Sequence, residues 1–167
     1  RQVNEIAERA PDAKPAASTP ADADLKTLRG KVHATIEKVT GDIRRFSFNT
    51  GISAVMELTN AGGQLLAASE GPLYGDAAAI LREYAEVAVI LLNPYAPHIT
   101  EELWEILGGD GLACDQPWPK ADPEALVKET ITLVVQVNGK LRARLDVPPD
   151  MPREELKALA QREKNVL

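Results

Sequence analysis

Cysteine, histidine and aromatic residues are scarce in this chain. Cys114 is the only cysteine, and just two histidines accompany it among 167 residues. One cysteine excludes an intrachain disulfide, and so few strong ligands make a zinc or other metal site unexpected. No apolar run is long enough to cross a bilayer, and no basic start leads into an apolar signal segment. We therefore predict a protein of the reducing cytoplasm with no membrane partner.

Apolar residues, by contrast, are plentiful enough for a packed core. They make up 44% of the 167 positions, which suits one ordinary domain or a domain with a small appendix. The chain starts with Arg1 rather than Met and ends on the apolar pair Val166-Leu167. We interpret it as a piece of a longer protein.

Charge is distributed unevenly along the chain, whose formal net charge is −6. Between residues 62 and 110, eight acidic residues accompany a single Lys or Arg residue, Arg82. Basic residues gather on either side of this stretch, at Lys26, Arg29, Lys31, Lys38, Arg44, Arg45, Lys140, Arg142 and Arg144. Such patches bind a phosphate backbone where the local field is positive. Charge alone favours the simpler interpretation of ordinary solvated faces.

Apolar residues recur at helical spacing as far as residue 107. One face is apolar in each of five stretches, at residues 3–7, 25–43, 52–59, 76–92 and 99–107. Asp22 or Asp24 is available as N-cap of the first long helix. Four long amphipathic helices with short joints predict a mainly α fold built as an antiparallel helical bundle.

The second long helix has its own expected ends. Asn49 or Thr50 would cap its first turn, and Gly62-Gly63 would end it. Residues 63–75 are poorly patterned, so we expect a connection between helices there.

The periodicity changes from helix to strand near residue 131. Alternating apolar residues at 131–137 and 141–147 flank Asn138-Gly139, which is the strongest short signal for a β-hairpin. A final helix from about Pro152 completes a small α+β piece. The domains expected are therefore a short helix and linker at 1–24, the bundle at 25–114, a linker at 115–130 and the α+β piece at 131–167.

The register of this hairpin follows from its apolar pattern. A two-residue loop would pair Val135 with Arg142 and mix apolar and basic side chains on one face. We predict a loop with an odd number of residues, with Gly139 at a bulge, so that Val135 pairs with Leu141. Lys140, Arg142 and Arg144 would then share the opposite, solvent-facing side.

Four segments resemble class I aminoacyl-tRNA synthetases specific for leucine, isoleucine and valine. The stretch from Leu91 to Trp104, with its two prolines, histidine and acidic pair, resembles the helix joint of their anticodon-binding bundle. Residues 43–52 resemble the start of a bundle helix, and Gln116-Pro117-Trp118-Pro119 resembles the segment that leaves the bundle. Residues 133–142, LVVQVNGKLR, are specifically similar to bacterial leucyl-tRNA synthetases, where they open a small C-terminal domain.

This resemblance implies a tRNA-handling fragment of an enzyme. The family's two ATP-binding signatures and its editing domain are absent from the sequence, so no catalytic residue and no cofactor is expected in the fragment itself. The parent enzymes use ATP and magnesium to attach leucine to tRNA. The implied partners are leucine tRNA and the missing catalytic and editing domains, with a monomeric state. The tRNA-binding candidates are Lys140, Arg142, Arg144, Arg44 and Arg45.

Two alternatives stay open at this point. The chain could be the equivalent piece of an isoleucyl- or valyl-tRNA synthetase, or a helical protein-interaction module without RNA. Trp104 and Trp118 could stack on bases, but their positions favour packing. His98 has no nucleophile near it in the sequence, which favours a structural role at the helix joint over acid–base chemistry.

Overall fold

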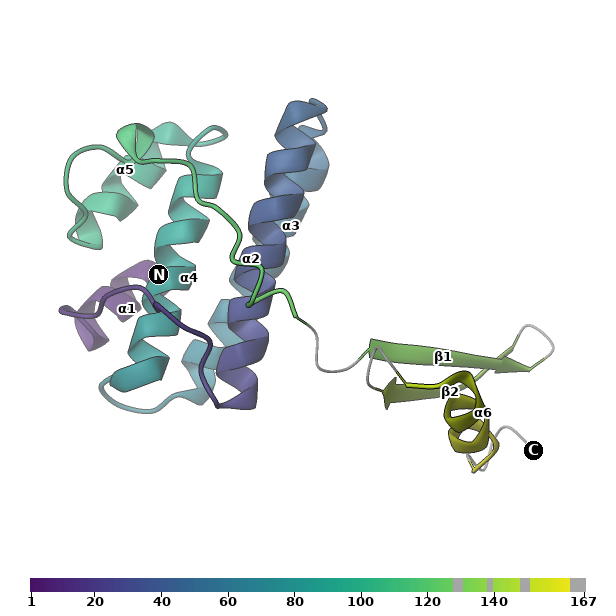
Figure 1. Ribbon diagram of the computed structural model, residues 1–167. Helices are drawn as coiled ribbons and strands as arrows, with labels where there is room; N and C mark the ends of the chain where they lie inside the picture. The colour runs from purple at the N-terminus through teal and green to yellow at the C-terminus, as the bar shows by residue number, and fades with distance from the viewer. Residues whose placement is uncertain (128–130, 138–139, 148–150, 163–167) are drawn as a thin grey trace. The chain divides into compact units, whose positions relative to one another are not determined.

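A computed structural model describes residues 1–127, 131–137, 140–147 and 151–162 (Figure 1). The chain forms two compact units, Arg1–Leu126 and Val127–Leu167. The elements of the first unit are α1 (Gln2–Arg9), α2 (Ala23–Arg44), α3 (Phe48–Ala68), α4 (Gly75–Leu92), α5 (Pro97–Ile106) and the 3-10 helix η1 (Ala113–Asp115). The second unit holds β1 (Ile131–Val137), β2 (Lys140–Val147) and α6 (Arg153–Arg162). The predicted mainly α fold is confirmed.

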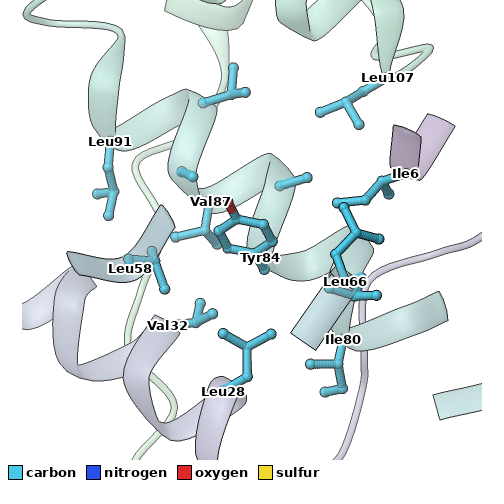
Figure 2. Close-up of a cluster of buried hydrophobic side chains, with 14 of the residues drawn as sticks. Ile6, Leu28, Val32, Leu58, Leu66, Ile80, Tyr84, Val87, Leu91 and Leu107 are labelled. Carbon is cyan, nitrogen blue, oxygen red and sulfur yellow. The ribbon is translucent and has the colours of Figure 1, made fainter. Parts of the chain in front are cut away.

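The core of the first unit lies where α2, α3 and α4 pack together (Figure 2). Each helix contributes side chains from the apolar face that its sequence predicts. The largest fully buried ones are Ile6, Val32, Val39, Leu58, Leu66, Ile80, Leu81 and Leu91. None of the described helices is long and apolar enough to span a membrane.

Asp22 is the N-cap of α2, as predicted, and its carboxylate accepts bonds from the backbone N–H groups of Asp24 and Leu25, both at 3.0 Å. The predicted ends of α3 are wrong. The helix begins at Phe48 and continues through Gly62-Gly63 to Ala68. Gly62 lies inside the helix, where its missing Cβ leaves room for the ring of Tyr84.

The proline joint between α4 and α5 brings Trp104 into the core, with 7% of its surface exposed. Helix α5 begins at Pro97, where the missing N–H costs no hydrogen bond. Its buried face carries Thr100 and Trp104, whereas Ile99 and Ile106, which we predicted on that face, are 47% and 37% exposed. His98 is exposed.

The segment before residue 25 belongs to the bundle instead of being a detached helix and linker. Ile6 is fully buried. Arg9 donates hydrogen bonds to the carbonyl oxygens of Ser69 and Gly71, at 2.8 and 2.7 Å, where α3 ends. Free carbonyls at a helix end need such donors, so α1 also completes α3.

Most of the expected linker at 115–130 also lies against the bundle. Residues 116–126, the strap, run along α2 in the opposite direction. Trp118 donates its indole N–H to the Thr40 hydroxyl at 2.8 Å. Further along, the carbonyl oxygen of Ala125 lies 3.1 Å from the Cβ position of Gly30, which a side chain there would crowd.

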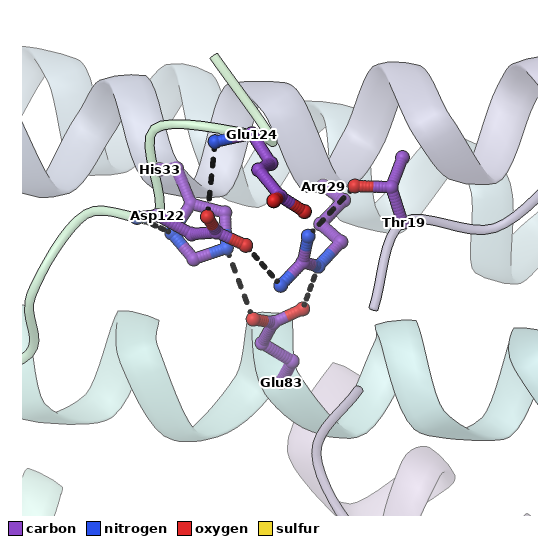
Figure 3. Close-up of polar contacts among 6 residues, drawn as sticks. All are labelled: Thr19, Arg29, His33, Glu83, Asp122 and Glu124. Carbon is purple, nitrogen blue, oxygen red and sulfur yellow. Dashed lines mark hydrogen bonds and ion pairs between the residues drawn. The ribbon is translucent and has the colours of Figure 1, made fainter. Parts of the chain in front are cut away.

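A buried polar group, the Arg29 cluster, holds the strap in place (Figure 3). Arg29 is 3% exposed. It binds the carboxylates of Glu83 at 3.1 Å and Asp122 at 3.0 Å, and it donates to the Thr19 hydroxyl at 2.9 Å. His33 completes the cluster: Nδ1 accepts the backbone N–H of Asp122, and Nε2 faces Glu83, both at 3.1 Å. These bonds assign a neutral ring protonated on Nε2.

The hairpin of the second unit differs from the predicted register. Val137 pairs with Lys140, so two residues separate the strands, and Val135 pairs with Ala143. The predicted Val135–Leu141 pair and odd loop are therefore wrong. A register shift between Val135 and Gln136 leaves Arg142 without a partner, as in a β-bulge. The bulge shifts the register by one residue from that of a plain two-residue hairpin, but toward Ala143 and not toward the predicted Leu141. Residues 138–139 lie outside the described residues.

Candidate nucleic-acid interface

Arg44 and Arg45 lie at a sharp corner where α2 passes into α3. The corner, residues 44–48, is closed by backbone bonds to the last turn of α2. The N–H groups of Arg45 and Ser47 donate to the carbonyl oxygen of Asp42 at 3.2 and 2.8 Å. This tight closure puts Phe46 at a φ of +57°, the only positive value of a non-glycine residue in the described chain. A side chain in this conformation carries strain.

The carboxylate of Asp42 organises the corner from inside. Asp42 as a whole is 2% exposed. Lys38 and Thr50 donate to one carboxylate oxygen at 2.9 and 2.7 Å, and Arg45 donates to the other at 2.7 Å. The hydrogen bonds from Lys38, then Thr50 and Arg45, lower the pKa of Asp42 to about 2, against the opposing effect of burial. Asp42 thus stays charged and ties α2 to the first turn of α3.

Three aromatic rings form a row at the corner. Phe46 is 79% exposed and Phe48 is 45% exposed. The Phe46 and Phe48 rings meet edge to face with centroids 5.9 Å apart, and Phe48 meets Tyr95 in the same way at 6.1 Å. Burial, and then the charge of Asp42, raise the pKa of the Tyr95 hydroxyl.

Positive charge surrounds the outer end of this row. Arg44 is exposed and makes no ion pair within the part of the chain that the structure describes. The side chains of Arg45 and Lys38 remain 69% and 52% exposed although both bind Asp42. Two cations therefore bind one buried carboxylate and Arg44 adds a third cation next in sequence, which leaves a local positive excess on an acidic protein. Such a surface can take a phosphate group.

Sequence reasoning selected the two arginines of this corner but missed Phe46 and Phe48. Their signal is visible in the sequence, because two aromatic residues follow the arginine pair in RRFSF. A pattern of this kind is ambiguous in sequence alone, since the same rings would serve equally well in the core.

The other predicted residues lie on β2, in the second unit. Arg142 is exposed at the bulge, and Val134, which pairs with Arg144, is 50% exposed. Ala143 is half-buried and Leu145 is 8% exposed, so these residues form the inner face. Lys140 and Arg144 belong to the same strand, opposite Val137 and Val134. Their side chains lie outside the described residues, so the predicted ridge is observed only at Arg142.

Nothing in the described residues suggests metal chemistry. No group of three His, Cys, Asp or Glu side chains in residues 1–127, 131–137, 140–147 and 151–162 could hold a metal ion. Desolvation, and then the nearby carboxylates of Glu101 and Asp115, raise the pKa of the Cys114 thiol. A raised pKa disfavours the reactive thiolate.

Comparison with known proteins agrees with the segments that the sequence singled out. Residues 26–158 match the family described as the anticodon-binding domain of tRNA ligase. Leucine–tRNA ligase of Magnetococcus marinus is 49% identical over 166 residues, covering 99% of this chain and 19% of the relative. The leucine–tRNA ligase of Stenotrophomonas maltophilia R551-3 is 50% identical over 146 residues, covering 86% of this chain and 16% of the relative.

A solved structure is similar along nearly the whole chain. It is the crystal structure of the ternary LeuRS–tRNA–LeuAMS complex of Agrobacterium radiobacter K84, with 27% identity and a TM-score of 0.80 over 99% of this chain and 20% of that one. The chain thus spans about a fifth of the length of these relatives. With the family model matching most of its length and the predicted helix joint present in the fold, the chain belongs to the family of anticodon-binding domains of tRNA ligases.

Proposed function

We propose that this chain is the tRNA-binding part of a bacterial leucine–tRNA ligase. It would hold the body of leucine tRNA while the parent enzyme activates leucine with ATP and magnesium and transfers it to the tRNA 3′ end. The fragment itself would neither bind ATP nor catalyse a chemical step, since the catalytic and editing domains lie elsewhere in the parent. The parent would work in the cytoplasm.

One observation carries this proposal. A leucine–tRNA ligase aligns with 99% of the chain at 49% identity, without a separate unmatched domain. The relatives named for leucine favour this amino acid over isoleucine or valine, and the structural relative was solved with tRNA. A protein-interaction module without RNA finds no support in these relatives.

The proposed contacts are to the tRNA backbone. Arg44 and Arg45 offer cations at the α2–α3 corner, and Arg142 offers one at the hairpin bulge. Lys140 and Arg144 share the strand of Arg142. Because the chain as a whole carries a charge of −6, binding depends on such local groups. Phosphate contacts fix orientation and carry little sequence information.

A filter-binding titration at two salt concentrations tests this function. The chain should bind leucine tRNA more tightly than an unrelated tRNA that has been refolded in the same way and titrated over the same concentrations. Its affinity should fall with salt by roughly 0.7–0.9 in log–log slope for each phosphate that the protein binds. Equal affinity for the two tRNAs would reject a leucine-specific role, and a flat salt dependence would reject binding through phosphate.

A further inference from the structure

The exposure of Phe46 is the least expected feature of the corner. A phenylalanine at positive φ strains the backbone, and a ring that is 79% exposed gains little from burial in return. Glycine or asparagine would adopt the same conformation with less strain. The folded state of the free chain therefore offers no reason for an aromatic ring at this position.

Backbone hydrogen bonds and a neighbouring ring fix the position of Phe46 at the surface. The backbone N–H of Phe46 donates to the carbonyl oxygen of Ile43 at 3.0 Å, and the flanking N–H groups of Arg45 and Ser47 bind Asp42. Phe48 meets the ring edge to face at a centroid distance of 5.9 Å. Because Phe46 is 79% exposed, its ring remains open for a base to stack on it.

The charged side chains beside the Phe46 ring indicate which kind of ligand it binds. Arg44 precedes it with an exposed guanidinium group that forms no ion pair with the described residues, and Arg45 holds a second one at the surface. Aromatic rings beside cations bind single-stranded nucleic acid, because bases stack on the rings while phosphates meet the charges. Bases inside a duplex have no free face, which leaves unpaired bases as the ligand.

We propose that Phe46 is a stacking platform for one unpaired RNA base, with Arg44 and Arg45 binding the phosphates next to it. This inference rests on the proposed function in taking RNA as the partner, and it adds the unpaired base as the specific ligand of the corner. Asp42 serves as a positioning residue, because it ties Lys38, Arg45 and Thr50 around the turn that presents the ring.

The test compares a short single-stranded RNA with a duplex of the same length and phosphate count, using the full 167-residue chain. The wild type should prefer the single strand. Phe46→Gly should weaken single-strand binding about 5- to 150-fold, the usual range for one stacked base, while duplex binding changes less than about 2-fold. Phe46→Tyr keeps a ring and should keep the preference.

The controls separate stacking from folding and from charge. Phe46→Gly relieves the strained φ, so its urea midpoint should be no lower than that of the wild type. Phe46→Asn, which also tolerates positive φ, gives a second ring-free variant. Arg44→Ala should weaken the binding of both RNAs and flatten the salt dependence of that binding.

Three results would overturn the proposal that Phe46 stacks on a base. In the first, the wild type binds the single strand no more tightly than the duplex. In the other two, the ring-free variants lose affinity equally for both RNAs, or lose no affinity at all. Reduced self-association in Phe46→Gly, seen by sedimentation, together with unchanged RNA binding would assign the ring to an interface between copies. A failure to discriminate leucine tRNA would reject the proposed function and leave this single-strand comparison standing.

Discussion

The hydroxyl group of Tyr95 lies against Gly51, so close that a Cβ atom on this glycine would overlap the oxygen. The same hydroxyl is buried without a hydrogen-bond partner among the described residues. Without the hydroxyl, the nearest ring atom would lie 3.5 Å from the added Cβ, which is ordinary contact. The first turn of α3 and the α4–α5 joint therefore meet through a glycine that makes room for one oxygen atom.

This contact predicts a strong coupling between two substitutions. Gly51→Ala alone should destabilise the chain by about 1–3 kcal/mol, because overpacking outweighs the gain in helix propensity. Tyr95→Phe should be neutral or stabilising, since it removes an unpaired buried hydroxyl. In the Tyr95→Phe background, Gly51→Ala should cost nothing or stabilise by up to about 1 kcal/mol. Urea unfolding of the four proteins measures the coupling, and an equal cost in both backgrounds would show that the ring moves aside.

The charge of Asp42 predicts how stability depends on acid. Its pKa falls from 3.8 to about 2 in the folded chain, chiefly through the hydrogen bond from Lys38. A lowered pKa stabilises the fold above the unfolded value, and this contribution is lost as pH falls from 3.8 through about 2. Asp42→Asn should therefore remove part of the decline in thermal midpoint within this window. Glu37→Gln, an exposed carboxylate on the same helix, is the control and should leave the decline unchanged.

The Arg29 cluster predicts a large cost for a small chemical change. Glu83 binds both Arg29 and His33 with a side chain that is 9% exposed. Glu83→Gln leaves the buried guanidinium with one carboxylate partner, Asp122, and should destabilise the chain by about 3–5 kcal/mol. Chemical unfolding measures this change, and a destabilisation below about 1 kcal/mol would show that Asp122 and water satisfy Arg29.

A paired variant separates the effect of charge balance from that of packing. Replacing the buried pair together, as Arg29→Met with Glu83→Leu, removes both charges and should recover much of the stability. The strap should nevertheless loosen, because Asp122 then lacks its cation. Limited proteolysis within residues 116–126 reports that loosening directly. An uncut strap in the double variant would mean that Trp118 and His33 hold it without Arg29.

Elements whose signal is local can be predicted from the sequence, whereas features set by distant neighbours cannot. Asp22 is recognisable as a possible cap because its chemistry acts within three residues. Gly62 has the local signature of a helix end, yet α3 continues through it, and the glycine instead makes room for the ring of Tyr84 from another helix. The strap has the composition of a linker, but Arg29 and His33 bind it from α2.

The candidate site is predictable in part for the same reason. Basic residues at a helix end are visible in a sequence, so Arg44 and Arg45 can be found there. The strained φ of Phe46 arises from how the turn closes onto Asp42, which no periodicity reports. In the hairpin, the requirement that apolar residues share a face correctly excludes a Val135–Arg142 pair, but the shift is created at Arg142 and runs the other way, so that Val135 pairs with Ala143 and not with Leu141.

Arg142 and Arg144 provide the last prediction, which concerns the hairpin as a tRNA-binding surface. Arg142 is exposed at the bulge, so its side chain is accessible to a phosphate. Changing both arginines to Ala in the full-length enzyme should weaken tRNA binding and lower the salt slope by roughly 0.7–0.9 for each phosphate that is no longer bound. Under the proposed function, leucine activation by the parent should stay intact, because the catalytic domain lies outside this chain. Lys157→Ala is the matched control for Arg142→Ala alone, since each removes one cation from the same unit. Equal slopes in the control and the arginine variants would attribute the effect to net charge, and unchanged binding would return both arginines to an ordinary solvated strand.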